Sequence, residues 1–273
     1  MNAFNYVRKE KFTASLIAIS AFLIVFSYSF LFFCSRDTLI RITAEDNWYE
    51  NLTPIFFMLA AFIFGYLYFT SGRGNDFYFF KTNRNIFYLF LVILLVFGAG
   101  EEISWGQRIF GWGTPANFSS HNLQHETNLH NLDMFQAEYY DKNGALVEKG
   151  GLLHRIINEN TLMNAFWVGW TVLVPLLYRF NSKSRQLINA VNIPFGTVQV
   201  GILIFFSGML LHFCTKYMPF AKDIAVIHPV EIKECNMSFL FFVLSIIIYR
   251  KEKSMVAVRK IAKPQVADFK IAS

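Results

Sequence analysis

Six long apolar segments alternate with polar segments along the chain. They cover residues 13–34, 53–71, 86–104, 161–179, 195–215 and 236–249. A helix needs about 20 consecutive apolar residues to cross the hydrocarbon core of a bilayer, and several of these segments approach that length. The first is longer than the apolar region of a cleavable signal peptide and no A-x-A site follows it, so we expect it to remain as an anchor. The pattern predicts an all-α integral membrane protein with six transmembrane helices.

Basic residues are distributed unequally between the polar segments. One set, 1–12, 72–85, 179–193 and 250–273, holds 16 Lys and Arg, whereas the alternate set, 35–52, 101–160 and 215–235, holds 9. The cytoplasmic segments of multi-pass proteins carry the excess of Lys and Arg. We therefore expect both termini to lie in the cytoplasm and the alternate segments to lie on the outer side.

Composition agrees with lipid as the main solvent. Of the 273 residues, 54% are hydrophobic and 16% are charged, whereas a soluble domain carries about 25% charged residues. We expect the basic tail, residues 250–273, to contact anionic lipid head groups of the bilayer. Nucleic acid is a poor alternative partner, because no basic and aromatic constellation accompanies this tail.

The chain is predicted to form one membrane domain, residues 1–273, with a single long outer loop between the third and fourth apolar segments. We expect this loop, residues 105–160, to fold as a cap on the outer ends of the helices. Residues 117–133 can form a helix with Ser119 or Ser120 as its cap. The segment YYDKNGALVEKGG predicts a hairpin around Asn143-Gly144, the preferred pair for a two-residue turn.

Two adjacent glutamates, Glu101 and Glu102, follow the apolar run FLVILLVFGAG. They lie at the C-terminal end of an outward-running helix, where the helix dipole disfavours negative charge. Carboxylates at membrane depth usually face a polar cavity or a functional pathway. If the helix continues, Glu101 aligns with Trp105 and Arg108, and one carboxylate would be paired and the other free. If it ends at Gly100, both glutamates lie in water.

The loop sequence SHNLQHETNLHN combines amides, an acid and imidazoles. His121 and His125 have the spacing of a metal-binding pair on a helix, but without an H-E-x-x-H motif the signal is weak. A divalent metal would more plausibly use His130, with His212 from the fifth apolar segment at the same depth. Cys214 and Cys235 lie near outer helix ends, and a disulfide between them is conceivable.

The blocks EEISWGQRIFGWGTP and NLHN resemble a group of uncharacterised bacterial multi-pass membrane proteins that carry EEISWGQR and NLHN signatures. The likeness covers mainly residues 101–131. It implies a bacterial plasma (inner) membrane and a site in this region, and it carries no activity.

The sequence therefore predicts an acidic, amide-rich site at the outer membrane boundary. In an enzyme, one glutamate would act as general base on a lipid or polyprenyl-linked substrate. In the alternative, the same acids would form an ion site of a transporter or a clasp for a partner subunit. The candidate catalytic residues are Glu101, Glu102, Glu126, His130 and Asn131; the candidate substrate-binding residues are Trp105, Gln107, Arg108, Asn122, Gln124 and Asn128; secondary acids are Glu50 and Glu231.

Overall fold

A computed structural model of the chain gives the arrangement of the helices. It describes residues 3–44, 47–72, 75–77, 80–122, 125–129, 132–135, 138–140, 146–148, 151, 156 and 158–268. Within this part, a long helix lies at each of the six predicted apolar segments, and the first and last helices extend well beyond theirs. They are α1 (Ala3–Phe33), α3 (Trp48–Thr70), α4 (Ile86–Glu102), the α8–α9 unit (Glu159–Val168 and Val174–Phe180), α11 (Val198–Tyr217) and α13 (Val230–Asp268).

Shorter elements connect the long helices. At one end of the bundle lie β1 (Asn75–Phe77), β2 (Phe80–Thr82) and α10 (Ser182–Val191); at the other lie α2 (Arg36–Thr43), α5 (Gln107–Phe110), α6 (Ala116–Ser119), β3 (Glu138–Tyr140), β4 (Leu146–Glu148) and α12 (Ile224–Ile227).

Five segments are long and apolar enough to cross a membrane, which is compatible with a multi-pass membrane protein. They are Glu10–Phe33, Arg36–Thr70, Thr161–Phe180, Val198–Tyr217 and Val230–Ser254. The remaining apolar helix, α4, has 17 residues. Its length is about 26 Å at 1.5 Å per residue, slightly less than the ~30 Å of a hydrocarbon core.

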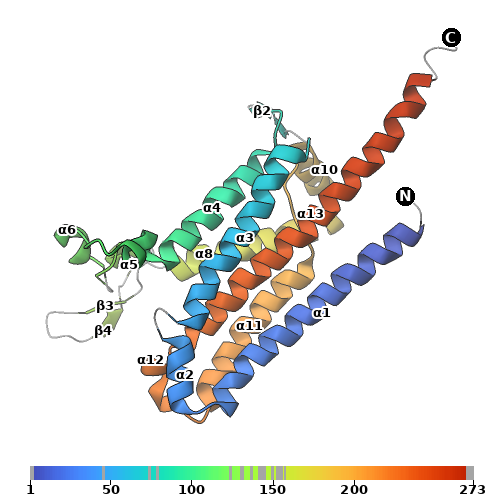
Figure 1. The fold of residues 1–273 in the computed structure, drawn as a ribbon. Helices are drawn as coiled ribbons and strands as arrows, with labels where there is room; N and C mark the ends of the chain where they lie inside the picture. Colours follow the sequence, from blue (N-terminus) through green and yellow to red (C-terminus); the bar gives the residue numbers. More distant parts are fainter. Residues whose placement is uncertain are drawn as a thin grey trace.

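The bundle is built around α13, which packs along α3, while α3 in turn packs along α4. Of the α13 span, 61% is buried, against 22–39% in the other four spans, so α13 is the central helix. Helices α1 and α11 lie against α13 on its other side. Figure 1 shows that α1 begins and α13 ends at the same end of the bundle.

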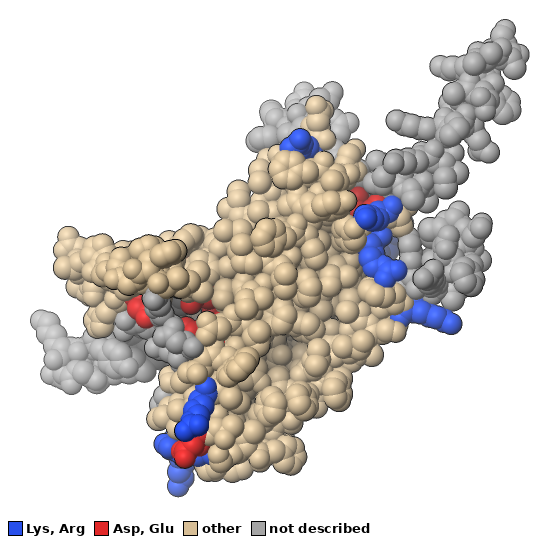
Figure 2. All heavy atoms as spheres, viewed as in Figure 1, with Lys and Arg blue, Asp and Glu red and all other residues tan. Residues whose placement is uncertain are grey.

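Charged side chains gather at the two ends of the bundle. On the face in Figure 2, the described Lys and Arg side chains lie at these ends, and the flanks between them consist of other residues. Many large apolar side chains on these flanks are exposed, including Phe22, Phe62 and Phe205. An uncharged apolar belt of this kind is the surface expected of helices solvated by lipid.

Polar contacts connect the helices inside the apolar bundle. Asn236 of α13 donates from Nδ2 to Ser27 Oγ of α1 at 2.9 Å, and the Tyr28 hydroxyl lies 3.1 Å from Ser207 Oγ of α11. The sequence analysis did not identify these residues, because single polar residues in apolar segments carry no pattern. Such hydrogen bonds fix the rotation of one helix against another.

A π-helical turn, Gly169–Leu173, separates α8 from α9 and precedes Pro175. Proline lacks an N–H, so the backbone ahead of it cannot keep the regular pattern. Helix α11 approaches this turn at Gly201, where an added Cβ would lie 2.5 Å from the Val172 side chain and 2.6 Å from Thr171 Oγ1. Small residues permit such close helix contacts in membranes.

The predicted hairpin in the long loop is confirmed as β3 and β4, an antiparallel pair. Its register pairs Tyr140 with Leu146, and the predicted turn residues Asn143 and Gly144 lie outside the described residues. The hairpin of β1 and β2 was not predicted.

Candidate functional site

The end of α4 is shaped by three successive left-handed residues. The helix stops at Glu102, and Ser104, Trp105 and Gly106 have φ values of 45°, 54° and 83°. The helix therefore runs past Gly100 but does not continue to Trp105, so it ends between the two alternatives of the sequence analysis. Non-glycine residues adopt this conformation at an energetic cost, and surrounding contacts must hold them there.

Trp105 nevertheless contacts Glu101, as the predicted helical spacing required. The turn folds the indole back over α4, and its Nε1 donates to Glu101 Oε1 at 2.6 Å. An added Cβ at Gly100 would lie 2.9 Å from two atoms of the indole ring, so glycine is needed for this close approach. Arg108 was predicted to align with Glu101 and Trp105, but its side chain lies outside the described residues.

Glu101 also holds the distant part of the loop. Its second carboxylate oxygen, Oε2, accepts from the backbone N–H of Leu129 at 2.6 Å. The side chain of Glu101 is only 5% exposed. A buried carboxylate that accepts two N–H donors forms charge-assisted hydrogen bonds, which are stronger than neutral ones. Glu101 therefore fastens both the turn after α4 and the returning loop to the end of the helix.

Glu126 is the second acid that connects the turn after α4 to the returning loop. The Ser104 hydroxyl donates to Glu126 Oε2 and accepts from Asn128 Nδ2 at 3.2 Å. Asn122 then donates from Nδ2 to the backbone oxygen of Asn128 at 2.7 Å and to its Oδ1 at 2.9 Å. The backbone N–H of Glu126 donates to Asn122 Oδ1 at 3.3 Å. Ser104, Asn122 and Asn128 are all buried.

Gln107 makes the third connection between the two arms of the loop. Its Oε1 accepts from the backbone N–H of Thr127 at 2.7 Å, and its Nε2 donates to Thr114 Oγ1 at 2.8 Å. We call Glu101, Ser104, Gln107, Asn122, Glu126 and Asn128 the clasp.

The clasp satisfies backbone groups that have no helical partner. Glu101, Asn122 and Gln107 each accept from a loop N–H. Non-helical backbone near a membrane is tolerated only where its polar groups are satisfied inside the protein. The density of acids and amides in this part of the sequence therefore has a structural cause.

The predicted helix over residues 117–133 is wrong. Among the described residues of this range, only those of Ala116–Ser119 are in an α-helix. His125 has a φ of 58°, and Asn122 pairs with Leu132 in an isolated bridge. Ser119 and Ser120 consequently cap no long helix. The chain turns here because its Ser, Asn and His side chains bond to nearby backbone groups in preference to a helix.

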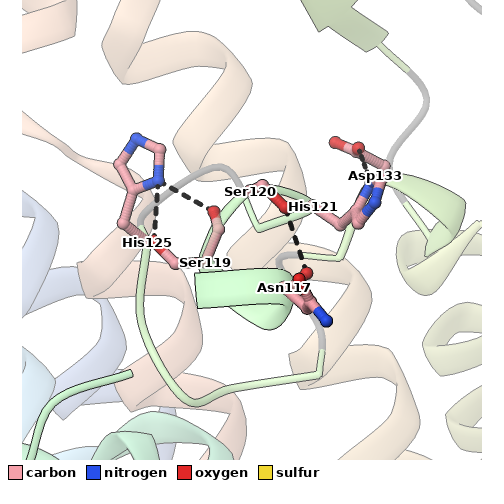
Figure 3. A network of polar contacts seen from close by, with 6 residues as sticks. All are labelled: Asn117, Ser119, Ser120, His121, His125 and Asp133. Carbon is pink, nitrogen blue, oxygen red and sulfur yellow. Dashed lines mark hydrogen bonds and ion pairs between the residues drawn. The ribbon is translucent and has the colours of Figure 1, made fainter. Parts of the chain in front are cut away.

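The two histidines of this turn have separate partners, as Figure 3 shows. His125 Nδ1 lies 2.9 Å from the Ser119 backbone oxygen. His121 Nδ1 lies 3.5 Å from Asp133 Oδ2 in an exposed ion pair. The spacing of a helical metal-binding pair is lost because the helix does not form.

The described residues do not provide a set of ligands for a metal ion. Among them, no three His, Cys, Asp or Glu side chains are grouped to hold a metal ion. His212 is exposed on α11. His130, Asn131 and Gln124 lie outside the described residues, so their predicted roles stay predictions. The three cysteines are unpaired, and the disulfide between Cys214 and Cys235 is absent.

The remaining acids lie at helix ends. Glu50 and Glu231 occupy the first turns of α3 and α13, as predicted, and both are half-buried. Glu102, the last residue of α4, is also half-buried. Figure 2 shows acidic side chains where the cap meets the helices.

Ser104 of the clasp was not identified as a site residue from the sequence, and neither were Thr114 and Thr127, the hydrogen-bond partners of Gln107. Hydroxyl residues in a loop give no signal for long-range hydrogen bonds, and only the glycines of SWGQRIFGWG could have indicated left-handed turns.

Comparison with protein-family models, curated proteins and solved structures gives no match for this chain.

Proposed function

We propose that this protein is a six-span protein of the bacterial inner membrane, with both termini in the cytoplasm, that acts on an amphipathic substrate at the outer membrane boundary. The substrate class is a lipid or polyprenyl-linked head group, and the reaction is hydrolysis or transfer. Glu102 is the general base, and His130 is its proton partner or a ligand of a divalent metal.

The assignment to Glu102 rests on its place in the chain. It is one of the two adjacent glutamates from which the base was predicted. A general base must reach the proton that it abstracts from the substrate. Glu102 is the last residue of α4 and is half-buried. Its position at the end of α4 is the observation that carries the proposal.

A non-catalytic role is the second candidate, because the clasp has a sufficient structural explanation. In this case the cap is a rigid platform for a partner subunit, and Glu102 supports it like the other acids. A transport path is less favoured. The fourth and fifth apolar segments hold three polar residues that such a path could use. Asn164 accepts from Trp167 Nε1 at 2.8 Å, Thr171 bonds to its own helix, and Gln199 is exposed.

The two candidates differ in what Glu102→Gln does to cells. A strain that lacks the protein is complemented with the wild type, Glu102→Gln or Glu101→Gln, and its membrane lipids are compared by mass spectrometry. We expect a lipid-linked species to accumulate without the protein, to return to normal with the wild type, and to stay raised with Glu102→Gln at equal protein level. Glu101→Gln is the control for a weakened clasp, in which the helical bundle stays folded.

A normal lipid profile with Glu102→Gln would refute the enzymatic proposal and leave the platform as the explanation. An unchanged profile in the strain without the protein would refute a lipid-linked substrate.

A further inference from the structure

Four large apolar side chains project from the turn after α4 into solvent. Trp105, Ile109, Phe110 and Trp112 are 42%, 68%, 73% and 45% exposed. We call these four residues the aromatic wedge. They lie within eight successive residues, and contiguous exposed apolar surface of this kind marks a protein or membrane contact.

The wedge has a defined shape. Gly106 and Gly111, both left-handed, bracket the four-residue helix α5. The rings of Phe110 and Trp112 stack at 5.3 Å with an interplanar angle of 16°. They pack over Gly106, where an added Cβ would lie 3.0 Å from the Phe110 ring and 3.7 Å from the Trp112 ring.

One side of α5 belongs to the cap and the other to the wedge. Gln107 turns inward to its hydrogen bonds with Thr114 and Thr127, whereas Ile109 and Phe110 are turned outward. This separation is that of a short amphipathic element, which lies at the surface of a membrane with its apolar side down.

The wedge continues the apolar surface of α4 that is directed away from the bundle. Phe90, Ile93 and Phe97 of α4 are 52%, 61% and 40% exposed. The Phe97 ring meets the Trp105 ring edge to face at 5.6 Å. From Phe90 to Trp112 the exposed apolar side chains thus follow one course, and α5 extends directly from the end of α4 in Figure 1.

The depth of the wedge follows from the length of α4. With 17 residues, this helix covers about 26 Å of a hydrocarbon core of about 30 Å. If α4 begins at one boundary of the hydrocarbon core, it ends slightly short of the opposite boundary, and the turn that follows it starts there. Interfacial Trp is enriched at that level.

We infer that the aromatic wedge inserts into the lipid interface at the C-terminal end of α4 and holds the cap on the membrane surface. The occupant of this surface is lipid, because the wedge is continuous with the exposed apolar face of α4. The turn at the other end of the cap has exposed polar residues, among them Asn117 and His121, and stays in water. The inference is independent of any reaction at Glu102.

The test measures the depth of spin labels on the full-length protein. Single cysteines replace Ile109, Phe110, Asn117 or His121 in a chain whose native cysteines are changed to alanine. Each variant is labelled with a nitroxide and reconstituted in vesicles of phosphatidylcholine and phosphatidylglycerol. Collision rates with oxygen, which concentrates in lipid, and with a water-soluble nickel chelate are compared. Positions 117 and 121 are the matched controls, because they are exposed in the same cap.

We expect oxygen to dominate over the nickel chelate at positions 109 and 110 and the ratio to be reversed at 117 and 121. Nickel accessibility at 109 and 110 equal to that at the controls would overturn the inference. Immobilised labels at 109 and 110 that neither reagent reaches would also overturn it, since a second copy or a partner protein would then cover the wedge.

Discussion

The clasp predicts that Glu101→Ala opens the cap while the helical bundle stays folded. The substitution removes the acceptor of two N–H groups, those of Trp105 and Leu129. A hydrogen bond to a charged group contributes about 1.5–3 kcal/mol. The loss of both therefore lowers the free energy of opening of the cap by about 3 kcal/mol or more.

Hydrogen exchange measures this loss at the site. A change of 1.4 kcal/mol is a factor of ten in an equilibrium constant, so ~3 kcal/mol makes exchange about a hundredfold faster wherever cap opening controls it. We expect this acceleration in peptides that contain Leu129, and little change in α13. Asp223→Asn is the matched acid substitution, because its only described ion pair is with Arg36, which belongs to α2.

Equal exchange of the Leu129 peptide in the wild type and Glu101→Ala would refute the clasp. The same acceleration in Asp223→Asn would show that any loss of an outer acid loosens the cap, and would refute the specific role of Glu101.

Three further results are expected. Gly100→Ala displaces the Trp105 ring, because the added Cβ would lie 2.9 Å from it, and overpacking of this kind costs about 1–3 kcal/mol. We expect a lower Tm in detergent than for Gly98→Ala, the control, whose added Cβ would lie 3.4 Å from the nearest ring. Asn236→Ala removes the hydrogen bond to Ser27 and lowers the free energy of unfolding by about 0.6 kcal/mol or slightly more. Denaturant titration in micelles measures this loss, and a stability equal to that of the wild type would contradict it. All three cysteines are unpaired, so denatured, unreduced protein takes up three maleimides by mass, and fewer would indicate a disulfide.

The helical part of the fold was predictable from single segments. The residues of α1, α3, α4, α11 and α13 are apolar over stretches of nearly membrane length, and this property does not depend on their neighbours in space. The acids in the first turns of α3 and α13 were predictable for the same reason, since a helix dipole acts locally.

The internal structure of the loop between α4 and α8 was not predictable. Residues 117–133 were expected to be able to form a helix capped by Ser119 or Ser120. Their backbone instead makes local turns, because Ser, Asn and His side chains compete for backbone groups. Whether such competition succeeds depends on long-range partners, here Glu101 and Gln107.

The sequence by itself determined the apolar helices and the unusual place of two glutamates at the end of one of them. Only the tertiary structure decided how these two differ. Glu101 is buried and accepts from Trp105 Nε1 and from the N–H of Leu129, 28 residues away, whereas Glu102 is only half-buried. Adjacent carboxylates look alike in a sequence, because the backbone turn and the chain that returns over it decide which donors each one meets.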